Sequence, residues 1–347
     1  MKTTGGRQMV SMKDIALRCN VSVATVSKAL SGRKDIGEDT RRRICKMADE
    51  MGYLSNAAAR ALKTNRTYNI GVLFVDEQHS GLTHDYFSAI LQSFKVEAEK
   101  RGYSITFINR YVGTRQTTYL QHCQYRGLDG VLIASVDFED PEVLELAGSQ
   151  IPIVTIDHIY NNHTAILSNN VSGMSDLVRY VHSKGHTKLG LIHGEFTNVT
   201  KNRVTSFYRT CKELGIEVSD EYIISGRYHD PISCAAATEK LLALPERPTC
   251  IFFSDDFSGM GGLDVIRKAG LRIPEDISVV GYDGIHLSQV IDPHLTTCWQ
   301  DTTTLGALSA EHLIRAIEEP KTTLPEQIMV SGKLLEGESV KDLNAAE

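Results

Sequence analysis

The sequence lacks the features that would assign it to a membrane, a secretion route or a disulfide scaffold. No run of roughly 18 or more apolar residues occurs among its 347 residues, so we expect no membrane span. The first residues, MKTTGGRQMVSMK, lack the apolar stretch of a secretory signal. The seven cysteines are odd in number and form no CxxC pair. These absences favour a cytoplasmic protein with reduced thiols.

Motifs for catalysis, metal binding and nucleotide binding are missing as well. The GMGG segment at 259–262 is not GxGxxG and is followed by no Walker lysine, and no GxSxG elbow occurs. Several histidines lie in separate predicted elements and fit no HExxH pair: His158, His163, His182, His186 and His193. The sequence therefore predicts no metal, no cofactor and no legible nucleophile.

The charge of the chain is divided unevenly. Residues 1–66 carry 14 Lys and Arg against 6 Asp and Glu, a balance of +8, whereas the rest of the chain carries 23 against 37. A chain of 347 residues with 41% hydrophobic residues fits two or three globular domains. A basic head on an acidic body indicates that only the head meets a polyanion such as DNA.

Residues 11–52 show the pattern of three short helices. The first opens near Asp14 and is expected to turn Ile15 and Leu17 inward. Asn20-Val21-Ser22 reads as a turn, and Ser22 is a good N-cap for a second helix over 22–31, which Gly32 ends. A third helix, about 38–51 before Gly52, is expected to bury four apolar side chains: Ile44, Met47, Ala48 and Met51.

The second helix carries side chains suited to a DNA major groove. Val26 and Leu30 fall on one face, which leaves short or basic residues elsewhere on the helix. The candidate DNA contacts are Ser22, Val23, Ala24, Thr25, Ser27 and Lys28. The small apolar ones can touch thymine methyls, Lys28 can reach guanine or phosphate, and the hydroxyls suit phosphate. The same pattern also fits a small helical bundle with a solvated basic face.

Long ordered motifs run through the whole chain. They are KDIA at 13–16, VSVATVSKAL at 21–30, TRRRI at 40–44, Gly52-Tyr53, NAAARAL at 56–62, ISVVGYDG at 277–284 and PHLTTCWQD at 293–301. Their order resembles LacI/GalR-family transcriptional regulators over roughly residues 11–342. The resemblance implies a helix-turn-helix headpiece over 11–55 and a hinge helix with linker over 56–67. It also implies a homodimer on a double-stranded, pseudo-palindromic DNA operator.

By the same resemblance, the hinge helix folds when two copies pair over DNA, with Asn56, Ala59 and Leu62 toward the duplex. Alone in water, so short a helix is marginal. Leu62 matches a leucine that wedges into the minor groove, and apolar wedges do unstack base steps. The alternative is that Leu62 packs on the body. Ser55 stands where the family usually has proline, which would loosen the start of the hinge.

From Tyr68 onward, short apolar runs alternate with amphipathic helical stretches, which is typical of α/β folds with doubly wound parallel sheets. Strands are predicted at 69–74, 104–108, 130–134, 153–156, 188–193, 250–253 and 277–282, with helices that include 86–101, 173–184 and 200–214. These strands are too many for one compact sheet and predict two lobes. The tail after Leu335 is polar and expected to fray.

The resemblance implies a periplasmic-binding-protein-like (type I) body whose chain crosses three times between lobes. The expected lobes are 68–166 with 301–328, and 167–300 with 329–342. Apolar residues of the helix 86–101 either contribute to a dimer interface or pack on their own sheet. No C-terminal leucine heptad supports a tetramer, so a homodimer is predicted.

Ligands of such sheets bind beyond the carboxyl ends of the strands, and the loops expected there carry an arginine, carboxylates and rings. That set suits a polyhydroxylated ligand, because charged groups pair with hydroxyls and rings cover the apolar face of a sugar. The candidate effector residues are Thr83, His84, Tyr86, Asp157, His158, Arg203, Tyr228, Asp256, Asp283 and Gln300. By the resemblance, Arg203, Asp256, Asp283 and Gln300 match effector-binding positions, and Tyr228 matches an aromatic wall.

Other interpretations of these residues stay open at this point. Arg203 also fits a surface helix start, Asp283 a turn cap and Asp256 a helix N-cap. Ser168-Asn169-Asn170 replaces the family's usual acidic-Asn pair, and Val199 stands where a small polar residue is common. These departures allow an effector unlike a simple free hexose.

The sequence as a whole predicts a DNA-binding repressor controlled by a small-molecule effector, a sugar or sugar derivative. A sugar-binding protein or a cleft enzyme with the same body are the alternatives. The basic head and the missing secretory signal disfavour the first, and the missing catalytic motifs disfavour the second. A protein corepressor in place of the small molecule stays open, as do the operator and the sign of the response.

Overall fold

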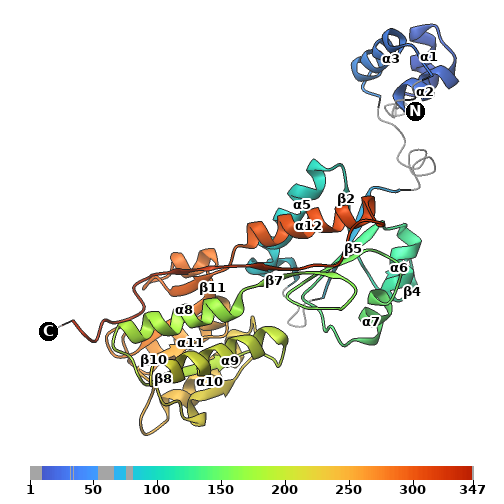
Figure 1. Ribbon diagram of the computed structural model, residues 1–347. Coiled ribbons are helices and arrows are strands. Elements are labelled where there is room, and N and C mark those ends of the chain that lie inside the picture. Colours follow the sequence, from blue (N-terminus) through green and yellow to red (C-terminus); the bar gives the residue numbers. More distant parts are fainter. Residues whose placement is uncertain (1–9, 32, 34, 54–65, 76–80, 346–347) are drawn as a thin grey trace, which may run out of the picture. The chain divides into compact units, whose positions relative to one another are not determined.

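The computed structural model describes residues 10–31, 33, 35–53, 66–75 and 81–345 (Figure 1). The chain divides into two compact units, Met1–Thr67 and Tyr68–Glu347. Within the described residues, no helix combines the length and the apolar character needed to cross a membrane. Gly32 and the expected hinge contacts Asn56, Ala59 and Leu62 lie outside the described residues.

The first unit is a three-helix headpiece. Its helices are α1 (Met12–Cys19), α2 (Val23–Leu30) and α3 (Glu38–Glu50), as the pattern predicts. They enclose a small core of Ile15, Ala16, Cys19, Val26, Ala29, Ile44 and Ala48. Ser22 caps α2, since its hydroxyl accepts a hydrogen bond from the Thr25 amide at 3.0 Å.

One expectation for the headpiece is wrong. Leu17 does not turn inward but is 81% exposed. An α-helix advances about 100° per residue, so the face that buries Ile15, Ala16 and Cys19 leaves Leu17 on the opposite side.

The second unit begins with a lobe built on a six-stranded, all-parallel sheet in the order β13-β7-β6-β5-β1-β2. The strands are β1 (Asn69–Phe74), β2 (Ser104–Phe107), β5 (Gly130–Ala134), β6 (Ile153–Ile156), β7 (Thr164–Ser168) and β13 (Gln327–Val330). A short hairpin, β3 (Tyr111–Val112) with β4 (Arg115–Gln116), lies apart from this sheet. The register pairs Ile70 with Gly130 and Phe74 with Ala134.

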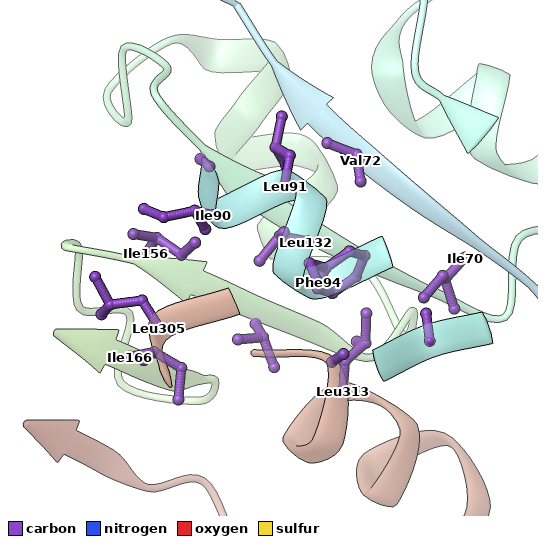
Figure 2. Close-up of a cluster of buried hydrophobic side chains, with 14 of the residues drawn as sticks. Ile70, Val72, Ile90, Leu91, Phe94, Leu132, Ile156, Ile166, Leu305 and Leu313 are labelled. Carbon is purple, nitrogen blue, oxygen red and sulfur yellow. The ribbon is translucent and has the colours of Figure 1, made fainter. Parts of the chain in front are cut away.

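Helices cover both faces of this sheet because successive strand residues point to opposite sides. On one face α5 (Asp85–Lys100) lies beside α12 (Thr302–Glu318), and Figure 2 shows their side chains meeting those of the strands. That core includes Ile70, Val72, Ile90, Phe94, Leu132, Leu305 and Leu313. On the other face, α6 (Tyr119–Arg126) and α7 (Pro141–Ala147) cover Leu73, Val131 and Ile133.

The packing of α5 decides between the two interpretations of its apolar residues. Ile90, Leu91, Phe94 and Ala98 are buried in the core of their own lobe. They therefore pack on the sheet and on α12, and are not available to a second chain.

The second lobe repeats the design, with the strand order β14-β12-β11-β10-β8-β9. Its strands are β8 (Leu189–His193), β9 (Ile223–Ser225), β10 (Cys250–Phe252), β11 (Ser278–Asp283), β12 (Thr296–Trp299) and β14 (Lys333–Leu335), of which β14 alone runs antiparallel to its neighbour. One face carries α8 (Asn170–Ser183) and α9 (Asn198–Glu213), and the other carries α10 (Pro231–Leu242) and α11 (Asp256–Lys268).

The chain passes between the lobes after β7, after β12 and after β13, so each lobe is discontinuous (Figure 1). Both β7 and β13 belong to the first sheet, so the expected boundaries after 166 and after 328 fall inside strands. The tail does not fray as expected: the Ser339 hydroxyl accepts from the Thr296 amide and donates to the Val279 carbonyl. Further on, the Leu343 amide donates to the Lys184 carbonyl.

The strand orders indicate where a ligand is expected to bind. In the first sheet β1 lies between β2 and β5, and in the second β8 lies between β9 and β10. The direction of winding reverses at these two strands, and parallel sheets bind ligands beyond the carboxyl ends of strands at such points.

Candidate functional site

The first turn of α2 forms an exposed surface on the headpiece. Val23 and Ala24 are exposed, Lys28 is half exposed, and Thr25 and Ser27 are half buried. Val26 and Ala29 face the core instead. An open hollow lies beside this turn, lined by Lys13, Ala16, Leu17, Asn20, Val21, Ser22 and Val23. The predicted contact residues thus share an accessible surface on a short helix.

Two polar interactions bear on how that surface works. The Ser22 and Thr25 hydroxyls lie 2.8 Å apart, so each has a hydrogen-bond partner at the N-terminus of the helix. Lys28 Nζ lies 2.8 Å from an Asp35 carboxylate oxygen, with both side chains about half exposed. An exposed ion pair is worth little, so Lys28 can exchange Asp35 for a phosphate or a base at small cost.

In the body, Arg203 is the centre of a buried polar cluster. It lies on α9, which follows β8, and is 7% exposed. Its Nε donates to Asn170 Oδ1 at 2.7 Å, and Nη1 donates to the Ser254 carbonyl at 2.9 Å. Its guanidinium carbon lies 3.5 Å from the centroid of the Tyr282 ring. Arg203 is therefore a held, buried cation and not a surface arginine.

Asp283 and Gln300 lie against this cation. Asp283 Oδ1 is 3.7 Å from Arg203 Nη2 and accepts a hydrogen bond from Gln300 Nε2 at 2.7 Å. Burial raises the pKa of Asp283 well above its ordinary value, although Arg203 acts in the opposite direction. Gln300 is 4% exposed, and within the described residues no donor reaches its Oε1.

The first lobe contributes Tyr86 and Asp157 to the same place. The amide of Ser168 donates to Asp157 Oδ1 at 2.6 Å, and the Tyr86 hydroxyl donates to Asp157 Oδ2 at 3.3 Å. Burial raises the pKa of both Tyr86 and Asp157, while the charge of Arg203 lowers both. The charge of Arg203 on the second lobe thus acts on two groups of the first lobe.

Aromatic side chains line the same region. The His84 and His229 rings, one from each lobe, stack at 3.6 Å with 9° between their planes, and His229 stacks on Phe257 at 4.1 Å. The Tyr228 hydroxyl lies 2.9 Å from Thr200 Oγ1, and its ring lies 5.6 Å from the Arg203 guanidinium carbon. The two lobes thus touch through an aromatic stack beside the buried cation.

Three predicted residues occupy other positions. Asp256 is fully buried, its oxygens accept from Thr297 Oγ1 at 2.7 Å and from the Ile285 amide at 3.0 Å, and burial raises its pKa to about 7. It therefore joins α11 to β12 and to the loop after β11, whereas the N-cap of α11 is Asp255. Thr83 lies exposed in a 3-10 turn, and His158 stacks on Phe138 at 4.0 Å.

Backbone strain marks the same edge of the sheets. Ser135, Asp157, His229 and Asp283 all have positive φ, at 50°, 55°, 53° and 103°. Each follows or ends a strand. L-residues adopt this region at a cost of about 1–3 kcal/mol each, and such residues cluster at binding sites.

Sequence reasoning missed the residues that hold the cluster in place. Asn170 and Ser254 accept from Arg203, and Ser168 holds Asp157. The segment 168–170 drew attention only as a departure from the family pattern. A polar residue directly after a buried strand was the available signal, but its partner lies 33 residues away in the case of Asn170. The described residues contain no group of three or more His, Cys, Asp or Glu placed to hold a metal.

The chain is similar to known proteins along nearly its whole length. Residues 11–56 match the model for bacterial regulatory proteins of the lacI family, and residues 178–340 match a periplasmic binding protein-like domain. A relative from Bacillus subtilis (strain 168), named as probable HTH-type transcriptional repressor ExuR, is 30% identical over 338 residues, covering 96% of this chain and 99% of the relative. The HTH-type transcriptional repressor PurR of Escherichia coli O139:H28 is 30% identical over 340 residues, covering 96% and 98%.

Solved structures agree on the fold. The lac repressor dimer bound to operator and the anti-inducer ONPF matches with a TM-score of 0.76 and 22% identity, over 96% of this chain and 100% of that one. The complex of the transcriptional regulator CelR with cellobiose matches with a TM-score of 0.69 and 23% identity, over 95% and 99%. The relatives are named as repressors and not as enzymes or transport proteins. The chain therefore belongs to the lacI family of bacterial regulatory proteins and is a DNA-binding transcriptional regulator.

Proposed function

We propose that the chain is a repressor whose affinity for its operator is set by a small molecule, a sugar or sugar derivative, bound between the lobes. The observation that carries this proposal is the buried Arg203 cluster. It lies where both sheets present the carboxyl ends of their strands, with Tyr86 and Asp157 facing it from the other lobe.

The chemistry of the cluster fits a polyhydroxylated ligand. Asp157, Asp283 and Gln300 offer carboxylate and amide oxygens to hydroxyl donors. The half-buried Tyr228 ring offers a flat face to the C–H side of a sugar ring. A structural relative, CelR, was solved with cellobiose, which is consistent with a carbohydrate in a body of this fold.

Control of DNA binding follows from the connection between the units. Two copies form a homodimer and place two α2 helices in successive major grooves of a pseudo-palindromic operator. The segment 56–63 pairs over the centre, with Asn56, Ala59 and Leu62 toward the minor groove. A ligand that prefers one arrangement of the lobes changes the separation of the two segments, and so shifts the affinity for DNA. Such a regulator works in the cytoplasm, with the DNA.

In vitro selection of DNA by the full chain tests the DNA half of the proposal. The expected product is an inverted repeat whose half-sites are one helical turn or a small multiple apart, bound by a dimer in sedimentation. Lys28→Ala should change the preferred base or weaken binding, while Lys46→Ala, a matched change on the exposed side of α3, should do neither. No enriched sequence, or a single half-site bound by a monomer, would contradict the proposal.

A thermal-shift panel of sugars, sugar derivatives and nucleosides tests the ligand half. A ligand present at about 100 times its Kd adds about 2.7 kcal/mol to the free energy of unfolding. If no compound of the panel shifts the unfolding temperature, a protein corepressor becomes the candidate effector.

A further inference from the structure

The lining of the Arg203 cluster carries more information than the presence of a ligand site. We infer that the effector is an uncharged, hydroxyl-rich molecule, and that the site rejects uronates and sugar phosphates of the same stereochemistry. This inference rests on the proposed function, because it concerns the ligand of the same site.

The first argument is the balance of charge. Arg203 supplies one positive charge, and Asp157 and Asp283 supply two carboxyls around it, while the charges of Asp255 and Asp256 also raise the pKa of Asp283. The guanidinium is already engaged, by Asn170, by the Ser254 carbonyl and by Asp283. An anionic ligand would therefore meet a cation whose charge is matched, and carboxyls that repel it.

The second argument is the balance of donors and acceptors. Gln300 points its amide nitrogen at Asp283, so its oxygen is the buried atom that needs a donor. The opposite assignment of the amide would set its oxygen against the Asp283 carboxylate. A buried acceptor without a donor is costly, and a hydroxyl satisfies it. A ligand that places its carboxylate or phosphate against Gln300 has no proton to give there.

The third argument is the shape of the lining. The face of Tyr282 is covered by Arg203, and the Tyr86 hydroxyl is used by Asp157 and Ser168. The Tyr86 hydroxyl is therefore not free to donate to an anionic group. A sugar ring combines hydroxyl donors at its edge with apolar C–H faces, whereas an added anionic group would have to lose its hydration among acceptors.

Binding of an anion would favour uptake of a proton by the two carboxyls. Burial raises the pKa of both Asp157 and Asp283, so each is protonated more readily than an exposed carboxyl. An anion beside them would raise the pKa of both further, and its binding would take up a proton. Any residual binding of an acidic sugar should thus strengthen as the pH falls, while binding of the neutral sugar should change less.

The test is a thermal-shift and calorimetric titration of the full chain with matched series at pH 7.5. Each series contains one aldose, its uronate, its 6-phosphate and its 2-amino form, in the gluco, galacto and manno configurations, with cellobiose as a neutral disaccharide and inorganic phosphate alone. The expected result is a neutral member that binds at least about tenfold more tightly than its uronate and its phosphate. An anion that binds as tightly as its neutral partner overturns the inference and leaves the proposed function standing. If no member of the series binds, the inference is overturned and the proposal of a sugar effector loses its support. The DNA selection then still tests whether the chain is a repressor.

A pair of variants separates charge from shape. Asp283→Asn removes one negative charge in the site, and should move the ratio of anion to neutral affinity toward the anion by about tenfold. Asp264→Asn makes the same change on the exposed side of α11, where the residue pairs with Lys268, and should leave the ratio unchanged. An equal ratio in both variants overturns the charge argument. If Asp283→Asn fails to fold, the wild-type series and its pH dependence still decide the inference.

Discussion

Replacement of Arg203 by alanine is the perturbation for which the structure gives the clearest magnitude. It leaves Asn170 Oδ1 and the Ser254 carbonyl without their donor, and Asp283 without its cation. Removing one partner of a buried ion pair costs about 3–5 kcal/mol. We therefore expect the free energy of unfolding to fall by about 3–5 kcal/mol, in addition to any loss of ligand binding.

Urea denaturation of the full chain measures this loss. The single tryptophan, Trp299, ends β12 next to Gln300, so its fluorescence reports on this part of the second lobe. Arg209→Ala is the matched control on the same helix, because Arg209 is exposed and, among the described residues, forms an ion pair only with Glu213. An exposed pair contributes at most about 1 kcal/mol.

Two further results constrain the interpretation. Arg203→Lys keeps the charge but not the fork of donors, and should cost about 1–3 kcal/mol. Arg203→Ala combined with Asp283→Asn should cost less than the two changes added together, by about 0.5–3 kcal/mol, because the two groups interact. A loss from Arg203→Ala no larger than that from Arg209→Ala would refute the assignment of Arg203 as a buried, held cation.

Three other predictions concern DNA recognition and pH. Leu62→Ala should weaken binding to the selected operator while thermal unfolding is unchanged. An unchanged affinity in a gel shift would refute the proposal that Leu62 inserts into the minor groove. Lys28→Ala should cost about 1–3 kcal/mol at one base pair if Lys28 contacts a base edge. A uniform loss of affinity across sequences would show that Lys28 contacts phosphate. Asp35→Asn frees Lys28 from its ion pair and should raise the affinity for DNA in either case. Asp256 holds its proton in the folded chain up to about pH 7, against an ordinary value of 3.8, so its contribution to the free energy of unfolding should fall as the pH rises from about 4 to 7. Asp256→Asn should remove this pH dependence of the free energy of unfolding. An identical pH profile in the variant would contradict the assignment of the pH dependence to Asp256.

Two strands that are buried on both faces could be predicted from the sequence, whereas the edge strand β13 could not. NIGVLF and GVLIA are buried on both faces, so their positions, Asn69–Phe74 and Gly130–Ala134, are predicted to the residue. QIMV, at Gln327–Val330, lies at the edge of its sheet with an exposed, polar start. Its place depends on pairing with β7, which lies about 160 residues earlier in the chain. Local pattern carries no information about such a partner.

The candidate site, too, could be predicted only in part. Its residues could be nominated because loops after strands and family motifs pointed to Arg203, Asp283 and Tyr86. The separate roles of these residues could not be predicted. Asp256 resembles Asp283 in sequence, yet both of its carboxyl oxygens are hydrogen-bonded within the protein. The misplaced Leu17 has the same origin: an apolar residue on a short helix was taken for core, although the helical period turns it outward.

The central claim is that a ligand in the Arg203 site controls the affinity of the headpiece for DNA. The most direct measurement is the Kd of the full chain for its selected operator, by fluorescence anisotropy at fixed salt, with and without the ligand that the sugar series identifies. Allosteric coupling of about 1–3 kcal/mol predicts a change of roughly 5–150-fold. The account predicts a change of that size in either direction, and an operator Kd that stays the same at saturating ligand would contradict it.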